Sequence, residues 1–202
     1  MDPMRVEMDG VRRVFCSKQA DAFSAPPGRH AVVAAILRDS SEGVEVLLIR
    51  RAEHELDPWS GHMALPGGHG DAADESLAAT AVREISEEVG LDLREHAELL
   101  GRLPELVAAP RQLPIFPLVF ALAPGHEPRA NPCEVQEVVW ATLEHLRSPV
   151  AMSSHELMVR QQRHRFPAFD VGGRIVWGLT YRILGELLNT VGPLRGPARV
   201  GL

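Results

Sequence analysis

The sequence contains little cysteine, no long apolar run and no excess of positive charge. Its two cysteines, Cys16 and Cys133, are too few for a disulfide framework. It has neither a run of about eighteen apolar residues nor a charged segment leading into an apolar one, so we expect a soluble, cytoplasmic protein that does not enter a membrane. The formal net charge of −6 argues against general nucleic-acid binding, because such binding needs a positive surface.

The composition suits one compact domain. Of the 202 residues, 45% are hydrophobic and 24% are charged, which is enough apolar material for a substantial core. No internal repeat is visible. We expect the domain to span residues 30–190, preceded by an irregular N-terminal extension over residues 1–29 and followed by a flexible tail over residues 191–202.

The apolar pattern predicts strands that alternate with two principal helices. Short β-type runs lie at residues 30–37, 44–50, 99–103, 115–122 and 135–141. Gly172-Gly173 is a strong hairpin signal between strands at 163–171 and 174–177. Residues 179–188 have the pattern of an amphipathic helix, whose apolar face either packs internally or forms a homodimer contact. The interleaving predicts an α/β fold with a mixed sheet between helices.

One segment near the middle of the chain crowds three carboxylates together. It runs Arg83-Glu84-Ile85-Ser86-Glu87-Glu88-Val89-Gly90-Leu91. It ends a helical pattern that we expect from Asp74 to Val89, with Gly90 in the left-handed position that commonly terminates a helix. Residues three and four apart are neighbours on a helix, so the glutamates converge within roughly a quarter of its circumference. Like charges this close destabilise a helix unless a cation neutralises them.

Crowded oxygen ligands suit a hard divalent cation such as Mg²⁺ or Mn²⁺. We therefore interpret Glu84, Glu87 and Glu88 as metal ligands and as catalytic groups. The alternative interpretation is a solvated helix face, which is what most acidic clusters are. For Arg83, the corresponding alternative is a simple surface charge.

This segment resembles the Nudix box, the signature of hydrolases that act on nucleoside diphosphates linked to another moiety. The matching residues are Glu75, Arg83, Glu84, Ile85, Glu87, Glu88, Gly90 and Leu91. The preceding glycine, Gly68, stands one residue too early, which indicates an insertion and leaves either Asp74 or Glu75 in the first acidic position. The resemblance implies a Nudix-type α/β/α sandwich, a metal-dependent hydrolase, and a catalytic-site Arg83 that pairs with an acidic side chain and holds the loop before the helix.

A second resemblance, upstream of the box, is to the coenzyme A pyrophosphatase subfamily. It is carried by Leu47-Leu48-Ile49-Arg50-Arg51-Ala52 and by Gly61-His62-Met63-Ala64-Leu65-Pro66-Gly67-Gly68. Arg51 matches an arginine of that signature, which implies that Arg51, Gly67 and Gly68 bind substrate. The departures from the signature are Ile49 for threonine, Ala52 for serine, Leu65 for phenylalanine, and the lack of an internal arginine in residues 53–58.

Three functions follow from these resemblances. The first is Mg²⁺-dependent cleavage of the diphosphate of coenzyme A or its thioesters to 3′,5′-ADP and 4′-phosphopantetheine products. The second, favoured by the departures at Ile49, Ala52 and Leu65, is hydrolysis of another nucleoside diphosphate derivative, such as ADP-ribose, a dinucleotide polyphosphate, NADH or a modified nucleotide. The third is a Nudix-fold binding module without turnover, which the presence of all three box glutamates disfavours.

The general base is left open by the sequence. One of the box glutamates is a candidate, and so are Glu134 and Glu137, which follow a proline-containing loop and enter a strand. For each of the latter two, an ordinary surface charge is the more common role.

Further candidates lie in and beyond the upstream signature. Arg50 is placed to clamp a substrate phosphate, although an arginine at a strand end is equally often solvated. Trp59 and His62 are candidates for a base or pantetheine pocket, against ordinary packing and loop hydrogen bonding. We expect Trp177 to lie in the core.

Overall fold

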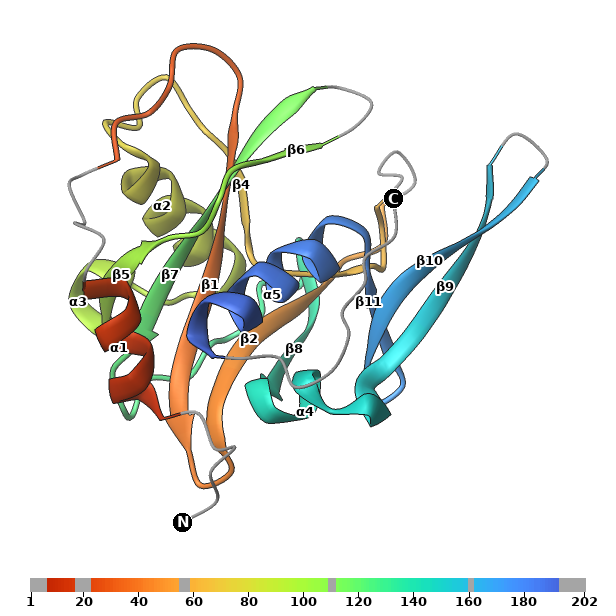
Figure 1. Ribbon diagram of the computed structural model, residues 1–202. Coiled ribbons are helices and arrows are strands. Elements are labelled where there is room, and N and C mark those ends of the chain that lie inside the picture. Colours follow the sequence, from red (N-terminus) through yellow and green to blue (C-terminus); the bar gives the residue numbers. More distant parts are fainter. Residues whose placement is uncertain (1–6, 17–22, 55–58, 109–111, 160–161, 193–202) are drawn as a thin grey trace.

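The computed structural model describes residues 7–16, 23–54, 59–108, 112–159 and 162–192 (Figure 1). Across these residues, eight strands form one sheet and three strands form a second, smaller one. The main sheet contains β1 (Ala31–Ser40), β2 (Gly43–Arg51), β3 (Met63–Ala64), β4 (Gly67–His69), β5 (Ala97–Arg102), β6 (Leu106–Ala108), β7 (Leu113–Leu122) and β8 (Val135–Thr142). The smaller sheet contains β9 (Met152–Val159), β10 (Gln162–Val171) and β11 (Arg174–Trp177). The helices are α1 (Met8–Cys16), α2 (Leu77–Val89), α3 (Leu93–His96), α4 (Leu143–Arg147), the 3-10 turn η1 (Pro149–Ala151) and α5 (Gly178–Val191).

The main sheet is mixed, as predicted. Its central order is β3-β2-β1-β7-β5, with β4 beside β1, β6 beside β7 and β8 beside β2. β1 and β7 run parallel, whereas β1 is antiparallel to both β2 and β4. Where β2 pairs with β8, the register shifts between Arg50 and Arg51. The five strands predicted over these segments are confirmed, with ends that move by three residues or fewer.

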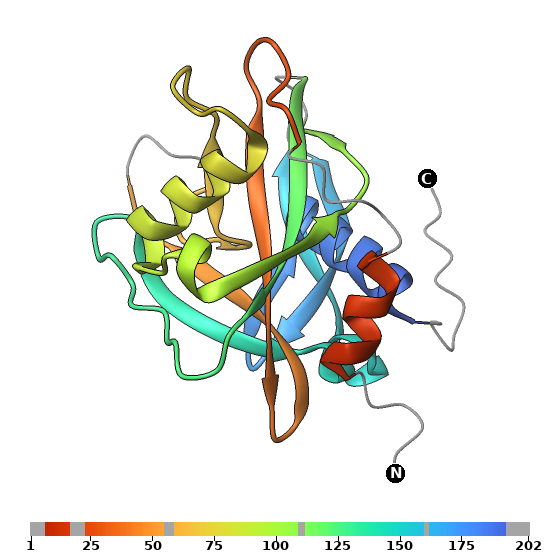
Figure 2. The ribbon, with the colours of Figure 1, turned by 90° about the vertical axis from the view of Figure 1, so that its left-hand side faces the viewer.

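Alternating side chains along β1 divide the apolar core into two layers. The even-numbered residues from Val32 to Ile36 pack against Leu77 and Ile85 of α2. Ala35 and Leu37 belong instead to the layer that includes residues of α1 and α5. Figure 2 shows the sheet between these helices, with α2 on one side and α1 and α5 on the other. The α/β architecture with a mixed sheet flanked by helices is thereby confirmed.

Helix α2 ends where the sequence predicts but begins three residues later. Ser76 caps its start, because the Ser76 hydroxyl oxygen accepts a hydrogen bond from the Ala79 N–H at 3.1 Å. The helix predicted from about Asp74 is therefore confirmed, with its first residue three positions later. At the other end Gly90 has φ 65°, and its N–H donates to the Ser86 carbonyl at 3.1 Å, which confirms the predicted helix stop.

The predicted irregular N-terminal extension is wrong for residues 8–16, which form α1. Met8, Val11 and Phe15 lie on one face of this helix and are almost completely buried. They join the core layer shared with α5, so this part of the extension contributes to the packed domain. Their spacing is helical, so the sequence did carry the signal. Residues 1–6 and 17–22 lie outside the described residues.

The C-terminal hairpin is confirmed and proves to be part of a larger sheet. β10 and β11 join through Gly172-Gly173 as predicted, and β9, which was not predicted, pairs with β10 along its length. β9 and β10 project from the body of the molecule (Figure 1). α5 extends the predicted helix at both ends, and its apolar residues Ile183, Leu184, Leu187 and Leu188 are buried internally.

The predicted tail begins at residue 191, but Val191 is the last residue of α5, and residues 193–202 lie outside the described residues. Among the helices that the structure describes, none is long and apolar enough to cross a membrane.

Candidate active site

The box residues meet the upstream signature where β4 passes α2. The Gly67 N–H donates a hydrogen bond to Glu88 Oε2 at 2.8 Å. A Cβ at Gly68 would collide with the Glu84 carboxylate, and a Cβ at Gly67, where φ is 138°, would collide with the Val32 carbonyl. Gly67 thus requires glycine, whereas a side chain at Gly68 would displace the Glu84 carboxylate, and together the two glycines bring the β4 backbone against two of the three box glutamates.

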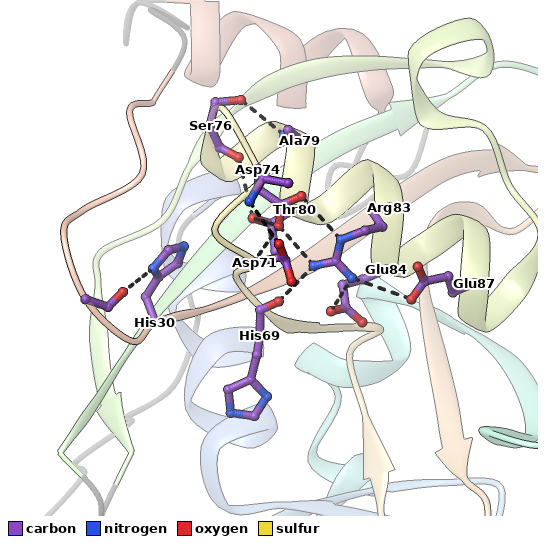
Figure 3. Close-up of polar contacts among 12 residues, drawn as sticks. His30, His69, Asp71, Asp74, Ser76, Ala79, Thr80, Arg83, Glu84 and Glu87 are labelled. Atoms are coloured by element: carbon purple, nitrogen blue, oxygen red, sulfur yellow. Dashed lines mark hydrogen bonds and ion pairs between the residues drawn. The ribbon is translucent and has the colours of Figure 1, made fainter.

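Arg83 connects α2 to the loop before it (Figure 3). Its Nη2 donates to the His69 carbonyl and to Asp74 Oδ2, each at 2.9 Å, and its Nε donates to Asp74 Oδ1 at 3.2 Å. Its Nη1 donates to Glu84 Oε1 at 2.9 Å and lies 3.5 Å from Glu87 Oε2. The guanidinium therefore holds the loop in place while it also orients the box glutamates.

Asp74, rather than Glu75, occupies the acidic position that faces Arg83. The Asp74 side chain is 8% exposed and also accepts a hydrogen bond from the Thr80 hydroxyl at 2.9 Å. The paired hydrogen bonds from Arg83 lower the pKa of Asp74 to about 2. Glu75 is exposed to solvent. The sequence left open whether Asp74 or Glu75 pairs with Arg83. In the structure Asp74 has this role.

The three box glutamates differ in their surroundings. Burial raises the pKa of Glu84, and it raises the pKa of Glu88 to about 8, because water no longer solvates the charged form. The negative charge of Glu134 raises both pKa values further. The Glu87 side chain, in contrast, is 50% exposed. The edge of α2 therefore presents a buried carboxylate at Glu88, a half-buried one at Glu84 that is paired with Arg83, and a solvated one at Glu87.

The donor chemistry of this edge fits a hard divalent cation, since carboxylates that raise one another's pKa would be stabilised as anions by a metal ion. In the part of the chain that the structure describes, however, no group of three or more His, Cys, Asp or Glu side chains is placed to hold a metal. Glu84 is bonded to Arg83 and Glu88 to the Gly67 N–H. Metal binding by Glu84, Glu87 and Glu88 stays a prediction.

The loop before β8 docks on the C-terminal end of α2 and brings Glu134 close. The Asn131 N–H donates to the Glu88 carbonyl at 2.8 Å, and the Asn131 side chain donates to the Glu87 carbonyl at 3.1 Å. The Ala52 N–H donates to the Glu134 carbonyl at 2.8 Å. Asn131 was not singled out from the sequence, because its role depends on helix carbonyls more than forty residues away in the chain.

The structure separates the two later acids that the sequence offered as general bases. Glu134 acts electrostatically on Glu84 and Glu88, as described above. Glu137 instead pairs with Arg174 of β11, whose Nε donates to Glu137 Oε2 at 2.9 Å, and this pair lowers the pKa of Glu137. Only Glu134 of the two is therefore placed beside the box.

Arg50 and Arg51 act in different surroundings. Because side chains alternate along β2, Arg51 points to the face opposite Arg50, and its charge lowers the pKa of Glu88 against the larger effect of burial. Arg50 donates from Nε to the Gly61 carbonyl at 3.2 Å and acts on Glu137. Consecutive side chains of a strand point to opposite faces, which separates the two arginines; the register shift beside them adds a residue in β8, Gln136.

Trp59, His62 and Trp177 come together on the Arg50 side. The ring centres of Trp59 and His62 lie 6.3 Å and 5.4 Å from that of Trp177. Trp177 is partly exposed, so the expectation that it lies in the core is wrong. The sequence could not show this, because Trp59 and Trp177 lie in distant segments.

Comparison with known proteins agrees with the box residues. Residues 28–170 match the NUDIX domain family. An uncharacterized Nudix hydrolase, NudL, of Photorhabdus laumondii is 32% identical over 163 residues, which are 81% of this chain and 85% of the relative. Nudix hydrolase 22, chloroplastic, of Arabidopsis thaliana is 30% identical over 164 residues, which are 78% of this chain and 53% of that protein.

Among solved structures, a MutT/nudix family protein from Enterococcus faecalis is similar over 91% of this chain and 68% of its own, with a TM-score of 0.49 and 18% identity. Enzymes of the Nudix family generally need divalent metal ions, although the match does not identify the ion. The family model matches most of this chain, and Arg83, Asp74 and the box glutamates are arranged as described above. This chain therefore belongs to the Nudix family and is a hydrolase.

Proposed function

We propose that this Nudix hydrolase cleaves the diphosphate of coenzyme A or its thioesters, giving 3′,5′-ADP and 4′-phosphopantetheine products. The observation that carries the proposal is the meeting of the two signatures in space. Gly67 and Gly68 of the upstream signature contact Glu88 and Glu84 of the box, and Arg51 acts on Glu88. The residues that resemble coenzyme A pyrophosphatases therefore surround the hydrolytic edge.

Glu84, Glu87 and Glu88 would hold the Mg²⁺ or Mn²⁺ ion. Such an ion, when bound, neutralises phosphoryl oxygens and makes a bound water more acidic. Arg51 binds a phosphoryl oxygen of the substrate, and Arg83 keeps the loop and Glu84 oriented. Glu134 or a box glutamate accepts the proton of the attacking water, while Glu137 is engaged with Arg174.

The departures from the upstream signature bear on the substrate. Ile49 and Leu65 are 1% and 3% exposed, so these two replacements change the packing of the core and not the surface that a substrate would touch. At Ala52 it is the backbone N–H that positions Glu134, which any side chain other than proline would allow. The departures at Ile49, Ala52 and Leu65 therefore do not count against coenzyme A, and the second candidate remains another nucleoside diphosphate derivative such as ADP-ribose.

The test is chromatography of products from coenzyme A, acetyl-coenzyme A, ADP-ribose, NADH and diadenosine polyphosphates, each with Mg²⁺ and after chelation. We expect coenzyme A or its thioester to give two monophosphate products, and chelation to abolish turnover. Reaction in ¹⁸O-labelled water, followed by mass spectrometry, would identify the phosphorus that is attacked. Turnover of ADP-ribose without turnover of coenzyme A would favour the second candidate, and turnover after complete metal removal would refute the mechanism.

A further inference from the structure

A hollow of about 260 Å³ lies on the side of β2 to which Arg50 points. Arg50 continues the row of Val46 and Leu48, which belong to the core layer shared with α5, so the hollow opens away from α2. The side chains that line it include Arg50, His62, His155, Arg174 and Trp177. They come from β2, the loop before β3, β9 and β11, and no box residue is among them.

One wall of the hollow consists of aromatic rings. His155 stacks on Trp177, with ring centres 4.2 Å apart and an interplanar angle of 24°. His62 meets Trp177 edge to face at 5.4 Å, and Phe166 and Trp59 lie 5.6 Å and 6.3 Å from the same ring. His62, His155 and Trp177 are all partly exposed, so their rings are accessible to a ligand that enters. A wall of this kind binds planar rings by stacking.

A second wall of the hollow contains two arginines. Arg50 and Arg174 both line the hollow, and both act on one carboxylate, Glu137. Arg174 is paired with Glu137 through Nε and Nη2, and its Nη1 donates to the Gly172 carbonyl, whereas Arg50 donates from Nε to the Gly61 carbonyl. Arginine groups in such an arrangement bind phosphate by directed hydrogen bonds.

We propose that this hollow binds the nucleotide end of the substrate, with the purine ring against the aromatic wall and the phosphate on the ribose beside Arg50 and Arg174. The identity of that nucleotide, a 3′-phosphorylated adenosine, rests on the proposed function. The pantetheine arm of coenzyme A has neither a planar ring nor a second phosphate, so it matches neither wall.

The position of the hollow relative to the hydrolytic edge agrees with this assignment. Arg50 and Arg51 are consecutive, and they serve the hollow and the carboxylates respectively. The proposal requires that a substrate whose diphosphate lies beside Arg51 extend around the end of β2 to reach the hollow. Arg50 and Arg51 would then contact two parts of one molecule.

The experiment is isothermal titration calorimetry of the full-length protein with 3′,5′-ADP, 5′-AMP and 4′-phosphopantetheine, none of which contains a diphosphate bond to hydrolyse. We expect Trp177→Leu to weaken 3′,5′-ADP binding tenfold or more. Arg50→Gln should weaken 3′,5′-ADP binding more than 5′-AMP binding, because only the former has the 3′-phosphate. Arg165→Gln, an exposed arginine of β10 that hydrogen bonds to Ser154, is the matched control and should change neither.

His155→Ala is the second variant, used where circular dichroism shows that Trp177→Leu does not fold. This substitution removes the partly exposed His155 ring of β9 and, like Trp177→Leu, should weaken 3′,5′-ADP binding. Equal 3′,5′-ADP affinity in the wild type and a folded ring variant would overturn the proposal. So would the absence of saturable 3′,5′-ADP binding by the wild type, or loss of 4′-phosphopantetheine binding in the ring variant.

Kinetics with coenzyme A separate this inference from the proposed function. Coenzyme A turnover with an unchanged KM in a folded ring variant would contradict the assignment of the hollow and leave the proposed function standing. If the wild type binds 3′,5′-ADP saturably, loses this binding when a ring is removed, and does not hydrolyse coenzyme A, the proposed function is contradicted. The assignment of the hollow as a nucleotide site then stands.

Discussion

The carboxylate edge of α2 and the hollow beside Arg50 lie on opposite sides of the end of β2, and they are built in different ways. On the α2 side, Glu84 and Glu88 are held by Arg83 and by the Gly67 N–H, and the backbone approaches them closely at Gly67 and Gly68. On the other side, rings and guanidinium groups from four separate segments surround an open hollow. The first side depends on fixed polar geometry, which small changes disrupt. The second depends on ring surface and charge, which tolerate gradual change.

The largest effect that would test this contrast is on the rate of hydrolysis. We expect Glu88→Gln and Glu87→Gln each to lower kcat about a hundredfold or more, because each removes a charge that stabilises the transition state. Steady-state kinetics with Mg²⁺ measure the change, and thermal unfolding shows whether the fold is kept. Near-normal rates in both variants would reject their role.

The next effect distinguishes the two later acids. Glu134→Gln should lower kcat at least tenfold if Glu134 accepts the proton of the attacking water. Glu137→Gln should have a smaller effect on kcat and lower stability by at most about 1 kcal/mol, since its pair with Arg174 is partly exposed. The comparison is of kcat at saturating substrate in the two variants. A larger loss in Glu137→Gln would reverse the assignment.

A change at Gly68 tests how tightly the backbone fits the carboxylates. Gly68→Ala places a methyl group where the Glu84 carboxylate lies, so we expect a loss of stability of about 1–3 kcal/mol and a fall in kcat on the order of tenfold to a hundredfold. Urea denaturation and kinetics measure the two effects. The control is Gly185→Ala within α5, where nothing lies within 4 Å of the added Cβ. It should raise stability by up to about 1 kcal/mol.

The smallest effect concerns Asp74 and pH. Because the folded-state pKa of Asp74 is lowered to about 2, the native state binds fewer protons than the unfolded state between about pH 2 and pH 4. The stabilisation is therefore present above about pH 4 and is lost as pH falls toward 2. We expect Asp74→Asn to lower stability by about 2 kcal/mol at pH 7, with the difference narrowing below pH 4.

Urea denaturation at several pH values checks this, with Glu75→Gln as the control. Glu75 is exposed, so its replacement should change stability by no more than about 0.5 kcal/mol at any pH. A pH-independent difference between Asp74→Asn and the wild type would show that its carboxylate is not held as an anion by Arg83.

The same contrast explains what could be predicted from the sequence. The box is contiguous, and helix periodicity relates its residues directly, so the end of α2, the Gly90 stop and the crowding of the glutamates were predictable. Asp74 could not be told from Glu75, because the choice depends on how the loop folds back on Arg83. The loop at Asn131, the pair of Glu137 with Arg174 and the ring contacts of Trp177 depend on segments far apart in the chain. α1 was missed although Met8, Val11 and Phe15 have helical spacing.

The alternation of Arg50 and Arg51 along β2 has a consequence for how this enzyme could be altered. Neighbouring residues of β2 point to opposite faces of the sheet. Substitutions among the aromatic residues of the hollow can therefore change substrate selectivity without altering the box glutamates. A one-residue insertion or deletion in the same strand would instead exchange the two guanidinium groups and disable both sides at once. Substitutions are therefore expected to alter the two sides of β2 separately, whereas a change in its length would alter both together.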